Sequence, residues 1–276
     1  MTDKLKEKEE FRYAPIGVFD SGVGGLTVAR EIMRQIPKER IIYFGDTARV
    51  PYGSKSKETI IRFSRQIIRF LQSKGVKAIV IACNTASALA LETVQPEFDI
   101  PILGVVKAGA KEAAKVTKNG KIGVIATEST IESQLYTKEI HSHKPNAQVL
   151  GKPCPLFVPL VEEGWLKDPV TVEVANRYLE PLLESGIDTL IMGCTHYPLL
   201  RSTLRQIMGE KVNLVNPAYE TARELKALLE RNGLQNYEGA MHEFYVSDAA
   251  NKFKNFANSI LPYGVDTTQL IHIEDY

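Results

Sequence analysis

Residues 78–85 read AIVIACNT. An uninterrupted apolar run of this kind is typical of a strand buried on both faces, as in a parallel sheet. Cys83 then lies at the carboxyl end of the strand, which is the edge where open α/β sheets bind ligands. A second stretch, TLIMGCTH at residues 189–196, ends with Cys194 in the same pattern of small residue, cysteine and two polar residues. The chain therefore has two predicted strands that each deliver a cysteine to a sheet edge.

Strands and helices alternate in the first part of the chain. Apolar runs predict strands at 16–19, 41–44, 78–82 and 101–106. Apolar residues at helical spacing predict helices at 26–35, 59–74 and 87–94. This alternation indicates βαβ units and a mostly parallel sheet.

The order of elements starts again after residue 107. Strands are predicted at 121–127, 148–150, 189–193 and 213–216, with a helix at 170–184. We therefore expect two similar parallel-sheet α/β domains related by a pseudo-two-fold axis, with the active site in the cleft between them. The first domain takes residues 1–107 plus 217–276, and the second takes 108–216. The returning segment adds helices at 221–231 and 251–260 and a strand at 244–246, and residues 1–12 form a flexible, charged tail.

Composition sets the class of protein. The 276 residues are 44% hydrophobic and 24% charged, with a net charge of +1, which is ordinary for a soluble globular protein. This balance does not favour a nucleic-acid or membrane-surface partner. The chain has no apolar run of the roughly 18 residues that a membrane span needs and no signal-peptide pattern at its start. Three cysteines do not indicate a disulfide framework, so we expect a cytoplasmic protein.

Two cysteines on opposite sides of one cleft suit the inversion of a stereocentre. One base removes a proton from one face, and an acid delivers a proton to the other face. A free cysteine has a pKa of roughly 8.5, which polar surroundings can lower. A thiolate at one position and a thiol at the other is therefore attainable near neutral pH, and the reverse reaction exchanges the two roles.

The neighbours of the cysteines suit a small polar ligand. Asp20 and Ser21 end the first strand at the same sheet edge as Cys83. Exposed backbone N–H groups at the start of the following helices favour a carboxylate. We expect Asp20 and His196 to exchange protons with the adjacent cysteines. The polar residues that directly follow the cysteines are Asn84, Thr85, Thr195 and His196.

Four ordered motifs resemble those of bacterial glutamate racemases of the aspartate/glutamate racemase family. They read DSGVGGL at 20–26, GDTARVPYG at 45–53, ACNTA at 82–86 and GCTHYPL at 193–199. Two shorter stretches, FVPLVE at 157–162 and YVSD at 245–248, fit as well. The resemblance extends from about Ile16 to Asp248, so it covers nearly the whole chain.

The resemblance implies cofactor-independent interconversion of L- and D-glutamate, without a metal, to supply D-glutamate for peptidoglycan and so for cell-wall biogenesis and cell shape. It implies that Cys83 takes the proton from D-glutamate and Cys194 takes it from L-glutamate. Glu162 matches an acidic residue near the second cysteine. Members of the family are often dimeric, so we expect a homodimer. The implied substrate contacts are Asp20, Ser21, Tyr52, Gly53, Asn84, Thr85, Thr195 and His196.

Other interpretations stay open at this point. Buried cysteines can be small core residues, which is how we interpret Cys154, and Asp20 can cap the following helix. The glycine-rich loop at 22–25 is typical of dinucleotide sites, but Thr27 stands where the third glycine belongs. A zinc site would combine Cys83, Cys194 and His196, without the short spacing such sites prefer.

Three further functions compete with glutamate racemisation. Aspartate racemase shares the two-cysteine logic. A cysteine hydrolase would use Cys83 or Cys194 as nucleophile with His196 as base. A protein that only binds acidic amino acids would leave the α-proton in place. The loop at 51–53 borders the expected site and is the candidate for a moving part.

Overall fold

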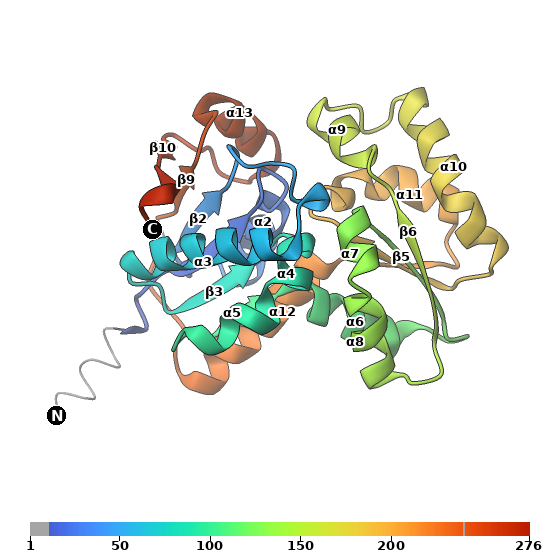
Figure 1. Cartoon of the computed structure of the whole chain (residues 1–276), viewed down its shortest axis with the longest axis horizontal. Helices are drawn as coiled ribbons and strands as arrows, with labels where there is room; N and C mark the ends of the chain where they lie inside the picture. The colour runs from blue at the N-terminus through green and yellow to red at the C-terminus, as the bar shows by residue number, and fades with distance from the viewer. Residues whose placement is uncertain (1–10, 240) are drawn as a thin grey trace.

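The computed structural model describes residues 11–239 and 241–276, and it contains two parallel sheets that lie side by side (Figure 1). The first sheet has the strand order β10-β9-β2-β1-β3-β4, and the second has the order β6-β5-β7-β8. All neighbouring strands run parallel. Most of the tail expected over residues 1–12 lies outside the described residues.

The first part of the chain forms four strands of the first sheet and several of the helices that cover it. In chain order they are β1 (Ile16–Asp20), α2 (Leu26–Gln35), β2 (Ile41–Gly45), η1 (Tyr52–Ser54), α3 (Lys57–Ser73), β3 (Ala78–Ile81), α4 (Asn84–Leu89), α5 (Leu91–Val94), η2 (Gln95–Glu97) and β4 (Ile102–Gly104).

The next elements build the second sheet and its helices. They are α6 (Val105–Val116), β5 (Lys121–Ala126), α7 (Glu128–Glu132), α8 (Leu135–His143), β6 (Gln148–Pro153), α9 (Phe157–Glu162), α10 (Pro169–Glu184), β7 (Thr189–Gly193), η3 (Tyr197–Leu200), α11 (Arg201–Met208) and β8 (Asn213–Val215).

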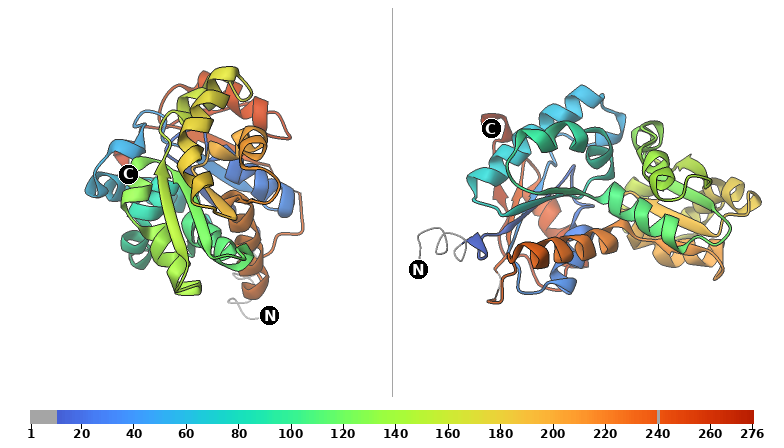
Figure 2. Two further views of the ribbon diagram at one scale, coloured as in Figure 1. Left: turned by 90° about the vertical axis from the view of Figure 1, so that its right-hand side faces the viewer. Right: turned by 90° about the horizontal axis from the view of Figure 1, so that it is seen from below.

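The chain then returns to the first sheet. The remaining elements are α12 (Pro217–Asn232), β9 (Glu243–Val246), α13 (Ala250–Ile260), β10 (Gln269–Leu270) and η4 (Ile273–Asp275). β9 pairs with β2, and β10 pairs with β9 at the outer edge. The chain passes between the sheets twice, through α6 and α12, and these two helices pack against each other (Figure 2).

The prediction of a parallel α/β fold with two sheets is confirmed. The four strands β2-β1-β3-β4 of the first sheet have the same order as β6-β5-β7-β8 of the second. Each set begins in its middle and places its third strand, β3 or β7, beside its first. The strand that precedes each cysteine is therefore central in its four-strand set.

The strands form where the apolar runs predicted them because both faces of each sheet are covered. All four residues of β3 and all five of β7 are buried. α2 and α12 pack on one face of the first sheet, and α3 with α4 and α5 on the other. α3 begins after Ser56, whose hydroxyl accepts from the Thr59 amide, and it ends before Gly75, whose φ of +70° a glycine adopts without strain.

Two local predictions are wrong. The strand predicted at 101–106 ends at Gly104, and Val105 and Val106 begin α6, where both are buried. A short apolar run does not distinguish a buried strand from a buried helix turn. The helix predicted at 87–94 begins earlier, at Asn84, because the Cys83 sulfur accepts a hydrogen bond from the Ala86 amide and caps it; the helix is interrupted at Ala90.

Candidate active site

Cys83 is held at the carboxyl end of the first sheet. Its side chain is 5% exposed, and its Sγ lies 3.4 Å from the Ala86 amide nitrogen, which donates to it. Burial and the nearby charge of Asp20 raise the pKa of Cys83 to about 12. The thiol of Cys83 therefore keeps its proton near neutral pH.

Cys194 follows β7 and has a different set of neighbours. Its Sγ lies 3.8 Å from His196 Nδ1. The other ring nitrogen, Nε2, lies 3.2 Å from Glu162 Oε1, and the second Glu162 oxygen lies 3.6 Å from Lys252 Nζ on α13. Cys194, His196, Glu162 and Lys252 thus form a chain of polar contacts that ends at the protein surface.

The contacts of His196 favour its charged form. Burial lowers the pKa of His196, but the hydrogen bonds to Cys194 and Glu162 outweigh this effect and raise it to about 10. The hydrogen bond to His196 in turn lowers the pKa of Glu162. A cationic ring beside Cys194 can stabilise negative charge on that sulfur.

Asp20 lies beneath the site and does not line the cavity. The side chain is fully buried, and its Oδ2 accepts from the Gly22 amide at 3.0 Å. Burial raises the pKa of Asp20, although the charge of His196 and the surrounding backbone N–H groups oppose that effect. Oδ1 has no hydrogen-bond partner among residues 11–239 and 241–276. A buried carboxyl with one open oxygen can hold or move a proton.

The two cysteines line one cavity of about 230 Å³. It lies between the two sheets, because one group of lining residues follows β1, β2 and β3 and the other follows β5, β6 and β7. The structure brings together ten of the eleven residues predicted for the site, and Asp20 is the exception. The ten are Ser21, Tyr52, Gly53, Cys83, Asn84, Thr85, Glu162, Cys194, Thr195 and His196.

Sequence reasoning missed several residues of the cavity wall. Thr127 follows β5 as Ser21 follows β1, so the internal repeat could have identified it. Its hydroxyl lies 2.9 Å from that of Thr85 across the two sheets. The remaining lining residues lie inside the quoted motifs but were not named as contacts, and they are Gly22, Val50, Pro51, Val158 and Pro159.

The loop that carries Tyr52 and Gly53 forms hydrogen bonds on both sides of the cavity. The Tyr52 hydroxyl donates to Asp46 Oδ2, which also accepts from Arg49. On the other side, the Ser129 hydroxyl of α7 donates to the Gly53 carbonyl. The candidate moving loop is therefore bonded to both halves of the site in this structure.

The glycine-rich loop at 22–25 serves close packing between the two halves. A Cβ on Gly24 would lie 2.4 Å from Thr195 Oγ1 and 2.5 Å from His196 Nδ1. Beside it, the Thr27 hydroxyl donates to the Thr195 carbonyl at 2.8 Å. The turn that follows Cys194 thus packs directly against this loop. No room is left there for the pyrophosphate of a dinucleotide.

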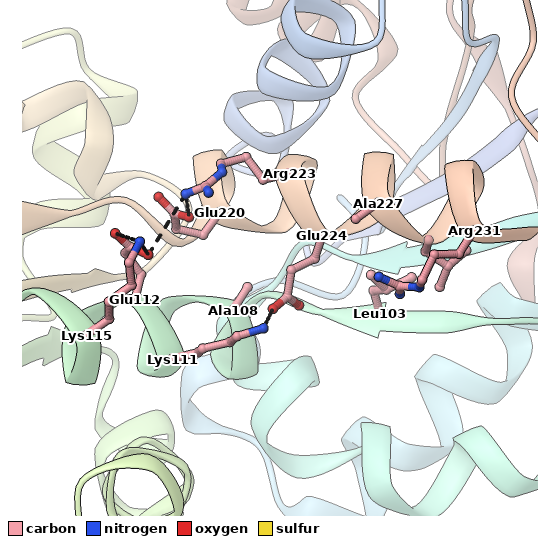
Figure 3. A pocket seen from close by; sticks show the side chains of 11 residues that line it. Leu103, Ala108, Lys111, Glu112, Lys115, Glu220, Arg223, Glu224, Ala227 and Arg231 are labelled. Atoms are coloured by element: carbon pink, nitrogen blue, oxygen red, sulfur yellow. Dashed lines mark hydrogen bonds and ion pairs between the residues drawn. The ribbon is translucent and has the colours of Figure 1, made fainter.

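A larger groove of about 430 Å³ lies between α6 and α12 and contains neither cysteine. Figure 3 shows that its charged side chains face one another across the groove. Lys111 of α6 pairs with Glu224 of α12 at 3.5 Å, and Arg223 of α12 pairs with Glu112 of α6 at 3.9 Å. These pairs join the two helices that connect the sheets, so the groove has a structural explanation.

Cys154 is fully buried in the core of the second sheet and lies outside the cavity. Burial raises its pKa, and its carbonyl accepts from the Tyr197 hydroxyl at 2.7 Å. Within the described part of the chain, no group of three or more His, Cys, Asp or Glu side chains is arranged to hold a metal ion. None of the helices in that part has the length and apolar character needed to cross a bilayer.

These features define a two-sheet α/β protein with two free thiols at one cavity between the sheets. The chain belongs to the Asp/Glu/Hydantoin racemase family, whose model matches residues 16–225. It is 50% identical to a glutamate racemase of Geobacter metallireducens over 248 residues, which are 89% of this chain and 92% of that protein.

Solved structures agree with this assignment. The crystal structure of a glutamate racemase isoform from Bacillus anthracis matches with a TM-score of 0.91 and 41% identity, over 94% of this chain and 98% of that one. A glutamate racemase from Francisella tularensis, solved in complex with D-glutamate, matches with a TM-score of 0.90 and 40% identity, over 96% and 100%. An aspartate racemase from Picrophilus torridus shares the fold, with a TM-score of 0.54 and 18% identity over 80% of this chain and 95% of that one.

Proposed function

We propose that this chain interconverts L- and D-glutamate without a cofactor, using Cys83 and Cys194 as its two bases. The observation that carries the proposal is that both sulfurs line one small cavity from opposite sheets. The chain covers nearly the whole length of relatives that are glutamate racemases. The likeness to aspartate racemases is limited to the fold, so glutamate is the favoured substrate.

In the L-to-D direction, the Cys194 thiolate removes the α-proton of L-glutamate. The C–H bond breaks, an S–H bond forms, and the electron pair remains on the planar α-carbon and its carboxylate. The Cys83 thiol, which keeps its proton because burial raises its pKa, then delivers that proton to the opposite face. The product is D-glutamate, with Cys194 protonated and Cys83 ionised, and the reverse reaction begins from that state.

The neighbours of the cysteines support these steps. The charged His196 ring, held by Glu162, stabilises negative charge on Cys194. Asp20 lies near Cys83 and accepts or returns a proton there. Hydroxyl, amide and backbone groups of the cavity wall bind the two carboxylates and the ammonium group. These groups belong to Ser21, Tyr52, Gly53, Asn84, Thr85, Thr195 and His196.

Proton NMR of L-glutamate in D₂O, with no added cofactor, tests the function. We expect loss of the α-proton signal together with decay of the circular dichroism of the amino acid. A two-base mechanism places deuterium in the D-glutamate product, while the remaining L-glutamate keeps its proton during early turnover. Equal deuterium in both pools would overturn the two-base assignment.

Substitution of either cysteine makes the assignment specific. We expect Cys83→Ser and Cys194→Ser each to lower kcat by at least about a thousandfold, within the range for loss of a general acid or base. Cys154→Ser is the matched control, because Cys154 does not line the cavity. Exchange of L-aspartate in place of L-glutamate would show that the reaction class is right and the substrate wrong.

The biological setting follows from this function. The proposed product, D-glutamate, would supply peptidoglycan synthesis in the cytoplasm.

The proposed domains, 1–107 plus 217–276 and 108–216, each hold one sheet and contribute one cysteine.

We also propose a homodimer. The exposed apolar side chains beside α9 and α10 are a candidate contact surface, with Leu156 and Val170 about half exposed. Light scattering of the wild type and of Val170→Asp tests this surface. A dimer that the substitution leaves intact would rule it out.

A further inference from the structure

Tyr136 is a buried residue of α8 to which the proposed reaction assigns no role. Its side chain is 3% exposed, and its hydroxyl donates to Asn84 Oδ1 at 2.7 Å. Asn84 directly follows Cys83 and lines the cavity. The hydrogen bond therefore connects a helix beside the second sheet to the cysteine-bearing end of the first.

The direction of this hydrogen bond fixes the Asn84 amide. Burial raises the pKa of Tyr136 above its usual value, so its hydroxyl keeps its proton and acts as a donor. A carboxamide oxygen accepts and its nitrogen donates twice. With Oδ1 held by Tyr136, Nδ2 of Asn84 makes no hydrogen bond to any other described residue. Because Asn84 lines the cavity, this nitrogen is available to a bound ligand.

The tyrosine side chain packs close to two glycines. A Cβ on Gly193, the residue before Cys194, would lie 3.1 Å from Tyr136 Cε2. A Cβ on Gly109 of α6 would lie 3.5 Å from the hydroxyl oxygen. The ring therefore fits against the strand end that precedes the second cysteine while its hydroxyl reaches the residue after the first.

We propose that Tyr136 is a positioning residue that orients the Asn84 amide so that Nδ2 donates to a carboxylate of the substrate. This inference rests on the proposed function, because it takes an acidic amino acid as the ligand. It predicts that the tyrosine hydroxyl acts on substrate affinity, not on proton transfer.

Tyr136→Phe removes the hydroxyl and keeps the ring. We expect KM for glutamate to rise about three- to tenfold, the effect of one hydrogen bond, and kcat to stay within about twofold. Tyr178→Phe is the matched control, because Tyr178 lies on α10 outside the cavity and its hydroxyl accepts from the Leu156 amide. A Tyr136→Phe variant with unchanged KM, or with a loss confined to kcat, would overturn the proposal.

A double-mutant cycle separates positioning from packing. If Tyr136 acts through Asn84, then Tyr136→Phe on an Asn84→Ala background leaves KM unchanged. An equal rise in KM on both backgrounds would show that the hydroxyl acts on the structure in another way. Racemisation by the wild type is measured first, so failure of the proposed function is distinguished from failure of the role given to Tyr136.

Discussion

Glu162 and His196 are joined by a contact of 3.2 Å between Oε1 and Nε2, and this contact lies on the side of the ring that faces away from Cys194. The carboxylate thus orients the ring and favours its charged form. The contact also connects α9 to the turn that follows β7. Glu162 is therefore expected to affect the chemistry at Cys194 through His196.

Glu162→Gln should lower kcat for L-glutamate about ten- to hundredfold, because the neutral amide supports the cationic ring less well. Racemisation assays across pH 6 to 10 check this, and the loss should be greatest at high pH, where the weakened ring is no longer protonated. Glu163→Gln makes the same change at the next residue, which is exposed, and should have little effect. Equal losses in the two variants would refute the role of Glu162.

The same pair makes stability depend on pH. The pKa of His196 in the folded protein, about 10, lies above the value near 6.5 expected when the chain is unfolded, so its contribution is complete below about pH 6.5 and is lost as pH rises toward 10. In acid, protonation of Glu162, whose pKa is lowered in the folded protein, removes the stabilising contribution of the pair again. Urea unfolding of the wild type and Glu162→Gln should show the largest difference near pH 6. A difference that grows from pH 7 to 10 would contradict this sign.

Gly24→Ala should disrupt the site from the other half of the protein. The added methyl group would overlap with Thr195 and His196, which must then move. We expect a fall in kcat of at least about tenfold, since small displacements of catalytic groups are costly. Gly264→Ala is the control, because the nearest atom to its Cβ is 4.0 Å away. Normal kcat in a folded Gly24→Ala protein would show that the close approach is not needed.

Lys77 should affect stability and not the chemistry. It is fully buried at the end of the first sheet away from the cysteines, where its Nζ lies 2.6 Å from Glu39 Oε2 and donates to the Leu234 carbonyl. Lys77→Met leaves the Glu39 carboxylate buried without its partner and should cost about 3–5 kcal/mol of unfolding free energy. Lys118→Met, at an exposed position, is the control. Calorimetry measures the loss, and activity per folded molecule should remain unchanged.

The sequence predicts the parts of this protein that depend on local patterns. The strands before Cys83 and Cys194 are continuous apolar runs, so their burial and their shared sheet edge could be predicted. α7 and α8 were missed because their apolar residues are few and follow no clear helical stripe. Val105 and Val106 were assigned to a strand because hydrophobicity alone does not reveal which element buries them.

Contacts between distant segments account for what the sequence could not reveal about the site. The hydrogen bond from Tyr136 to Asn84 joins residues 52 positions apart, and the contact of Lys252 with Glu162 joins α13 to α9. Asp20 was predicted to touch the substrate because it ends a strand at the correct edge. Its Oδ2 accepts from the Gly22 amide and the side chain does not line the cavity, an arrangement that strand periodicity does not encode.

The two cysteines have unequal neighbours, a carboxyl near Cys83 and a charged imidazole beside Cys194. Mirror-image substrates have the same free energy in water, and both directions pass through the same transition states. The ratio kcat/KM must therefore be the same for both enantiomers, whatever the asymmetry of the site. Any preference has to appear as matched changes in kcat and KM. The protein can retain one enantiomer longer, but the net flow toward D-glutamate is determined by the reactions that consume it.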